Sequence, residues 1–156
     1  MEINKVKGLC KEIIKFYDKE QKNKNIPKEM QENISNLRLQ KILLFLYCYY
    51  WKELKKEIIN INFYAWTYGP VVKPLYNFLK DCGSNGIDIY RFQEFETPKY
   101  NKKIFQKILN HLSQFSTMRL VSASHDTEPW LKTPNSSVID NELIKKWFEQ
   151  DVPEIK

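Results

Sequence analysis

The most compact group of side chains with catalytic potential lies in the segment SHDTEPW, residues 124–130. His125, Asp126 and Glu128 belong to the residue types that transfer protons in general acid–base catalysis or coordinate a metal ion. A structural interpretation competes with this one, because a histidine in the last helical turn interacts favourably with the negative pole of the helix, and nearby carboxylates bond free amides. No second cluster supplies further ligands, so we favour the structural interpretation and expect no metal site.

Other signatures of catalysis are missing from the sequence. It contains no CxxC, HExxH or GxGxxG pattern and no phosphate-binding loop, and it has only four glycines. Cys10, Cys48 and Cys82 are odd in number and fall on apolar helical faces, which favours core packing in a reduced, cytoplasmic protein. His111 lies beside an apolar stripe and is expected to be a surface or half-buried residue. The sequence therefore predicts a protein that is not an enzyme and that holds no cofactor.

Aromatic residues point to a second possible function, which is protein binding. In the segment 58–66, apolar residues alternate with polar or aromatic ones, so Trp66 shares a face with Asn60 and Asn62 that would normally be wet. An exposed tryptophan suits an interface. Alternatively, a helix covers this face too and Trp66 belongs to the core. The residues that we expect to contact a partner are Tyr64, Trp66, Tyr68, Gly69, Pro70, His125, Glu128 and Trp130.

A mainly α-helical fold must position these residues. Apolar residues recur at helical spacing over 3–22 and from 102 through 115, and a last helix follows Asp140. The segment 37–51, LRLQKILLFLYCYYW, is apolar nearly all round and is therefore predicted to be the central helix, with Ser35 or Asn36 as its cap. Its polar members, Arg38, Gln40 and Lys41, cluster near its start, so its other end is expected to lie deeper.

Shorter elements connect these helices. The alternation over 58–66 predicts one short strand, whose partner would be 87–92. Pro74 is predicted to open a short helix that ends at Gly83. Residues 116–125 are expected to form another helix, 126–130 a tight connection and 18–33 a polar, exposed one. The sum is a single compact domain, residues 1–156, of five or six helices with one short strand or small hairpin.

The charge balance bears on nucleic-acid binding. The formal net charge is +6, with eight lysines between Lys5 and Lys28, but only three arginines are present. Proteins that read base edges and phosphates rely on arginine forks, so the sequence favours protein binding and leaves a nucleic-acid-binding regulator as the alternative function. No stretch of the sequence is long and apolar enough to predict a membrane span, and the N-terminal residues lack the apolar block of a signal peptide.

Four segments, read in order, resemble the Panacea (SocA-like) antitoxin family. They are residues 37–51, the segment FYAWTYGPVVKPLYNFL (63–79), LVSASHDTEPW (120–130) and VIDNELIKKWF (138–148). They are similar to the family's KLQKLLY helix, its AW-x-YGPV-x-LY turn, its SA-x-L and H-x-x-PW segment and its final short helix. The AW-x-YGPV part is the most specific, and Phe115-Ser116 departs from the family's usual Tyr-Gly.

The resemblance implies an antitoxin that neutralises a co-encoded toxin by direct contact. It also implies a second candidate role, because one branch of the family acts as a protease adaptor that delivers its toxin for degradation. The expected partners are thus a cognate toxin and, in the second case, a protease or chaperone.

Overall fold

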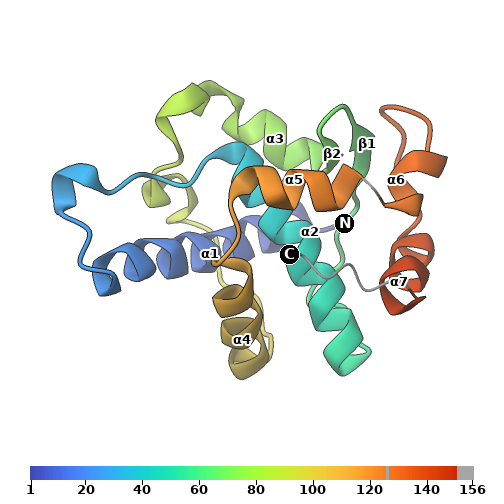
Figure 1. Cartoon of the computed structure of the whole chain (residues 1–156), viewed down its shortest axis with the longest axis horizontal. Coiled ribbons are helices and arrows are strands. Elements are labelled where there is room, and N and C mark those ends of the chain that lie inside the picture. Colours follow the sequence, from blue (N-terminus) through green and yellow to red (C-terminus); the bar gives the residue numbers. More distant parts are fainter. Residues whose placement is uncertain (126, 151–156) are drawn as a thin grey trace.

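One helix, α2 (Asn36–Leu54), forms the centre of the structure, which is a computed structural model describing residues 1–125 and 127–150 (Figure 1). Contacts join α2 to α1, α3, α4, α5, α7 and the hairpin strand β2. The Ser35 hydroxyl caps it by accepting a bond from the Arg38 amide at 3.1 Å. Its residues from Leu39 to Cys48 are all buried, which confirms that this segment is the central helix.

Six further helices surround α2 in the described residues. Five or six helices were predicted in all, and the additional one is Glu128–Lys132, a helical turn where a tight connection was expected. The polar connection after α1 contains a short 3₁₀ helix, η1 (Lys28–Met30). The helices are α1 (Ile3–Asn23), α3 (Lys73–Leu79), α4 (Lys102–Leu112), α5 (Thr117–His125), α6 (Glu128–Lys132) and α7 (Asn141–Gln150).

The only sheet in the described residues is a two-stranded antiparallel hairpin. Strand β1 (Tyr64–Trp66) pairs with β2 (Gly69–Val71), and Thr67 and Tyr68 form the turn between them. The prediction that residues 87–92 supply the partner strand is wrong, since this region contains the 3₁₀ helix η3 (Ile89–Phe92). The true partner follows after two residues because Gly69, at φ +93°, allows a tight turn.

Side chains of residues 59–66 alternate between buried and more exposed as predicted, but most of the segment does not pair as a strand. Ile59, Ile61, Phe63 and Ala65 are buried as expected, yet only the last three residues of the segment form a strand. The outer edge of β1 is bonded to residues 136–139, whose backbone pairs with Phe63 and Ala65 at 2.6–2.9 Å. The hairpin is therefore braced along β1 by a segment seventy residues away in sequence.

Two expectations about helix ends need correction. Gly83 has a positive φ, but α3 already ends at Leu79, and Gly83 lies at a kink within the 3₁₀ segment η2 (Lys80–Asn85). The start of α2 is not its shallow end, since Gln40 and Lys41 are as buried as the apolar residues that follow them. The burial of Gln40 and Lys41 arises from packing against the hairpin, which is distant in sequence.

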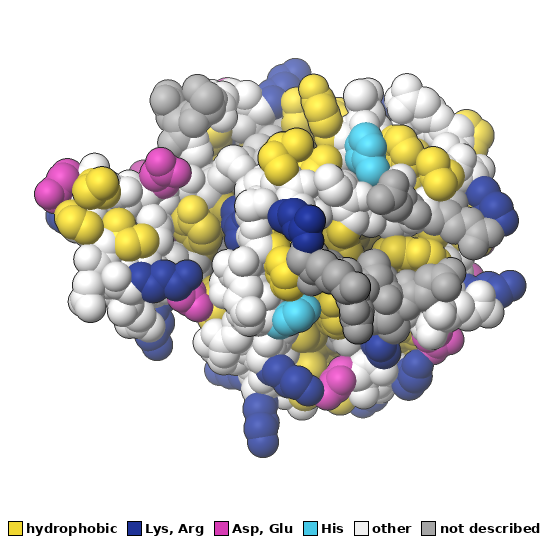
Figure 2. Space-filling model, in the orientation of Figure 1, with side chains coloured by type: hydrophobic (Ala, Val, Ile, Leu, Met, Phe, Trp, Pro, Cys, Tyr) yellow, Lys and Arg dark blue, Asp and Glu magenta, His cyan; other side chains and the backbone are white. Residues whose placement is uncertain are grey.

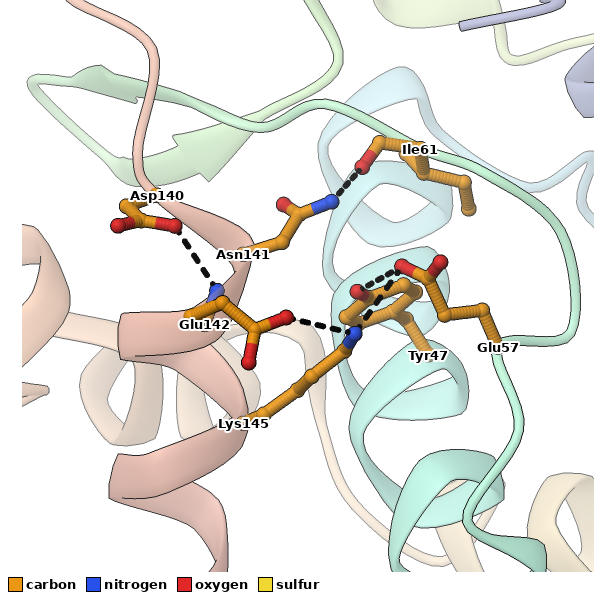
Figure 3. Close-up of polar contacts among 7 residues, drawn as sticks. All are labelled: Tyr47, Glu57, Ile61, Asp140, Asn141, Glu142 and Lys145. Atoms are coloured by element: carbon orange, nitrogen blue, oxygen red, sulfur yellow. Dashed lines mark hydrogen bonds and ion pairs between the residues drawn. The ribbon is translucent and has the colours of Figure 1, made fainter.

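Polar contacts attach α7 to the rest of the fold (Figure 3). The Tyr47 hydroxyl donates to Glu57, and the Lys145 ammonium lies 3.6 Å from the same carboxylate. Asn141 donates to the Ile61 carbonyl at 2.9 Å. Burial and the bond to Glu57 both raise the pKa of Tyr47, so this phenol stays protonated and serves as a donor.

In the residues that the structure describes, no helix is long and apolar enough to cross a membrane.

Candidate partner-binding surface

The hairpin is held in place by a glycine that no other residue can replace without strain. Gly69 has φ +93°, and a Cβ built there would lie 2.5 Å from the Ser124 hydroxyl oxygen and 2.8 Å from the Lys41 Nζ. The missing side chain thus allows β2 to approach α2 and α5 together. This close approach is the physical reason for glycine in the AW-x-YGPV segment.

Two side chains of α2 bond the backbone of β2 and of the residue that follows it. The buried Lys41 Nζ donates to the Pro70 carbonyl at 2.9 Å, and the buried Gln40 accepts from the Val72 amide at 2.8 Å. Burial lowers the pKa of Lys41 to about 7. Gln40 and Lys41 therefore supply hydrogen-bond partners to the Val72 amide and the Pro70 carbonyl, which would otherwise be unpaired.

The third segment of the family pattern completes the arrangement. Thr127 caps α6, and the Trp130 indole N–H donates to the Trp66 carbonyl at 2.7 Å. The His125 ring stacks on Trp130, with centroids 4.5 Å apart and planes 21° from parallel, while the Trp66 ring meets Tyr76 edge-on at 4.7 Å. The two ring pairs, linked by the hydrogen bond from Trp130 to the Trp66 carbonyl, form an aromatic row from the end of α5 through α6 and the hairpin to α3.

Two grooves flank this row. One, of about 450 Å³, lies between the hairpin, α3 and the start of α2, and the other, of about 440 Å³, lies between the hairpin and α6. Trp66 and Thr67 line both. We call the exposed and half-exposed side chains here the hairpin surface: Trp66, Thr67, Tyr68, Trp130 and Leu131. Figure 2 shows hydrophobic side chains gathered over the hairpin, the end of α5 and α6.

The eight residues predicted to contact a partner are brought together but differ in accessibility. Tyr68 is 63% exposed, whereas Gly69 and Pro70 are buried and shape the turn. The remaining described side chains, Tyr64, Trp66, His125 and Trp130, are half-buried. The side chain of Glu128 lies outside the described residues, as does Asp126.

Sequence reasoning missed Leu131 and Lys41. Leu131 is 65% exposed beside Trp130, and no periodic signal marks it because α6 has only five residues. Lys41 is fully buried although lysine is usually exposed. The only available signal was its place within an apolar helix.

Of the predicted cluster His125, Asp126 and Glu128, only the His125 side chain lies within the described residues. In residues 1–125 and 127–150, no group of three or more His, Cys, Asp or Glu side chains is placed to hold a metal ion. The His125 ring lies flat against Trp130, which makes it part of the aromatic row. The three cysteines are free, and Cys10 and Cys48 are buried as predicted, while Cys82 is half-buried.

The structure is thus a mainly helical core that holds an aromatic hairpin at its surface through hydrogen bonds from α2. Residues 39–131 match the family model of the antitoxin SocA-like Panacea domain, which covers more than half of the chain. The chain therefore belongs to the SocA-like Panacea family. It matches no curated protein and no solved structure.

Proposed function

We propose that this protein is the antitoxin of a toxin–antitoxin pair and neutralises a toxin protein by binding it through the hairpin surface. The family membership supports the antitoxin role. The observation that supports this particular surface is the meeting of three family segments at the hairpin. Buried Gln40 and Lys41 bond the backbone that follows the exposed Tyr68, and Ser124 packs against Gly69. A surface fixed in advance loses little conformational entropy on binding, and tyrosine and tryptophan contribute much of the energy at interfaces.

This role needs no catalytic group, and we propose that the protein acts as a binding protein in the cytoplasm. The aromatic row offers area and indole or phenol hydrogen bonds to a partner. His125 would contribute its ring face to that row rather than a proton.

Nucleic-acid binding is less well supported, because many of the lysines of the first helix are already engaged. Lys5, Lys15 and Lys24 form ion pairs at 2.8, 3.4 and 3.8 Å with glutamates that lie in α1 or cap it. Lys7 lies over the Phe78 ring, and Lys11 donates to a backbone carbonyl. A phosphate backbone would have to displace these partners. Salt-sensitive binding of duplex DNA or of RNA at low ionic strength would revive this alternative.

The adaptor role is a second candidate function, supported by family resemblance alone. It predicts that the toxin's half-life in cells shortens when this protein is present, and only in cells that retain the responsible protease. Simple neutralisation predicts an unchanged or longer half-life.

The direct test is co-expression with the neighbouring gene that encodes the toxin. The wild type should restore growth and co-purify with the toxin, whereas Tyr68→Ala and Leu131→Asp should each weaken the complex by at least about tenfold, as expected for a lost anchor. Tyr90→Ala is the matched control, since Tyr90 is 74% exposed but lies on η3, which packs against α1.

Two results would contradict the proposal. Absence of any complex with the neighbouring product would reject the antitoxin role. A complex that tolerates Tyr68→Ala and Leu131→Asp together, with both variants folded by circular dichroism, would keep the antitoxin role but reject the hairpin surface as its site.

A further inference from the structure

A third groove lies away from the hairpin, where α1, residues 26–34, the start of α2, the end of α4 and the start of α5 meet. Its volume is about 460 Å³, within the usual range of small-molecule sites. In Figure 1 the elements that form most of its walls, α1 and the segment after it, lie to the left, whereas the hairpin lies to the right. Its walls are largely apolar and include Ile13, Phe16, Ile26, Ile34, Ile42 and Leu109.

The walls of this groove are held by specific bonds, so it is preformed. The buried Gln21 side chain both donates to the Glu32 carbonyl and accepts from the Glu32 amide, each at 2.8 Å. Gln31 donates to the Ile26 carbonyl at 3.0 Å. The Ile34 carbonyl accepts from the Ile87 amide at 2.8 Å. The Ile26 amide donates to the Gln21 carbonyl at 3.2 Å, so the segment after α1 is attached at both of its ends.

One side chain in the groove carries a charge that the described residues leave without an anionic partner. Arg38 is half-buried, and its guanidinium makes one hydrogen bond, to the Thr117 hydroxyl at 3.2 Å, and no ion pair within the described part of the chain. Its position in the first turn of α2 is unfavourable, because the positive end of the helix dipole repels a cation. Burial also lowers the pKa of Arg38.

Two carboxylates, Glu20 and Glu32, line the groove, and neither forms an ion pair with Arg38. Glu20 lies 3.8 Å from Lys24 and accepts from Ser113 at 3.5 Å, while Glu32 is exposed. A guanidinium has five N–H donors and prefers a carboxylate in a bidentate arrangement. A half-buried arginine on the wall of this groove, with one hydrogen bond and no ion pair in the described residues, has N–H donors free for an anion.

We propose that this groove binds a medium-chain fatty acid, with its carboxylate on Arg38 and its alkyl chain between α1 and the segment 26–34. The apolar walls match the alkyl chain, and the unpaired guanidinium matches the head group. A neutral chain of the same length lacks the group that Arg38 selects. The site is separate from the hairpin surface, so it would make the protein responsive to a small amphipathic acid without blocking its partner.

The test uses octanoate and 1-octanol as probes in isothermal titration calorimetry on the full chain. Octanoate should bind saturably to one site, and 1-octanol at least about tenfold more weakly, as expected for a charge-assisted bond. Arg38→Met should weaken octanoate binding by a similar factor and leave 1-octanol unchanged. Arg119→Met is the matched control, because Arg119 is exposed on α5 and does not line the groove.

A second variant keeps the proposal testable if Arg38→Met fails to fold. Ser113→Trp places a large ring in the groove and leaves Arg38 intact, so it should abolish binding of both probes. Lack of saturable octanoate binding by the wild type, equal affinity for the two probes, or octanoate binding that survives Ser113→Trp would each overturn the proposal. Tyr68→Ala should bind octanoate like the wild type, so failure of the proposed toxin interface leaves this result unaffected.

Discussion

Replacing Lys41 with methionine should change how the stability of the protein depends on pH. The side chain is fully buried, and its Nζ donates to the Pro70 carbonyl at 2.9 Å. Burial lowers the pKa of Lys41 to about 7 from an ordinary value of 10.5. The folded protein thus favours the neutral amine, whereas the unfolded chain keeps the ammonium ion up to much higher pH.

The sign of the effect follows from proton uptake. Between pH 7 and 10.5 the unfolded chain binds a proton at Lys41 that the folded chain lacks, so the free energy of unfolding rises with pH by up to about 1.4 kcal/mol per pH unit. Below pH 7 Lys41 is protonated in the folded and in the unfolded chain, so its destabilisation of the fold is largest there and no longer changes with pH. From about pH 6 to about pH 9 the destabilisation of the fold by Lys41 should decrease by roughly 2.5 kcal/mol.

Urea unfolding of the wild type and Lys41→Met across this range measures the contribution. Methionine keeps an unbranched apolar chain but leaves the Pro70 carbonyl without its donor, a loss of about 1–3 kcal/mol that does not vary with pH. Burial also raises the pKa of Cys10 and Cys48, which lowers stability at the alkaline end, but these thiols are present in both proteins. The difference between the two curves therefore isolates Lys41. Parallel curves would refute the reasoning, since they would mean that the Lys41 amine is as well solvated in the folded state as in the unfolded one.

Three other substitutions test the packing described above. Gly8→Ala should destabilise the protein by about 2 kcal/mol or more in thermal or urea unfolding, because a Cβ there would overlap a backbone carbonyl of the segment before α4, and an unchanged midpoint would contradict this close approach. Trp130→Phe keeps the ring but leaves the Trp66 carbonyl without its donor, so we expect a loss of about 1–2 kcal/mol and weaker toxin binding in a pull-down; a fully stable variant would show that this bond contributes nothing. Tyr47→Phe removes the hydroxyl that donates to Glu57 and should lower stability by about 1 kcal/mol, with faster hydrogen exchange in α7 as the specific sign; uniform exchange changes would place the effect elsewhere.

The helical part of the fold was predictable because its signals are local. The apolar stripes over 3–22 and from 102 onward, the Ser35 cap and the Asp140 side chain that accepts from the Glu142 amide each depend on neighbours within a few residues. The strand pairing was not predictable from its pattern. Alternation over 58–66 reports burial of every second residue, and burial occurs here against helices rather than within a sheet.

The family motif located the candidate surface but did not show which of its residues are exposed and which are buried. Tyr68, Gly69 and Pro70 are adjacent in sequence, yet the first is exposed and the other two are buried. That division depends on Lys41 and Ser124, which come from α2 and α5. A family pattern records which residues a fold needs and does not say whether the need is structural or functional.

The sequence by itself determined a mainly helical chain with a central apolar helix, and its motifs identified the family. Periodicity, caps and motif spacing are properties of short segments, so they can be recognised in the sequence without a structure. Only the tertiary structure decided that Lys41 is a buried donor, that Arg38 lacks an anionic partner in the described residues and that Leu131 faces solvent. These are properties of desolvation, and the desolvation of a side chain depends on which distant segments pack around it.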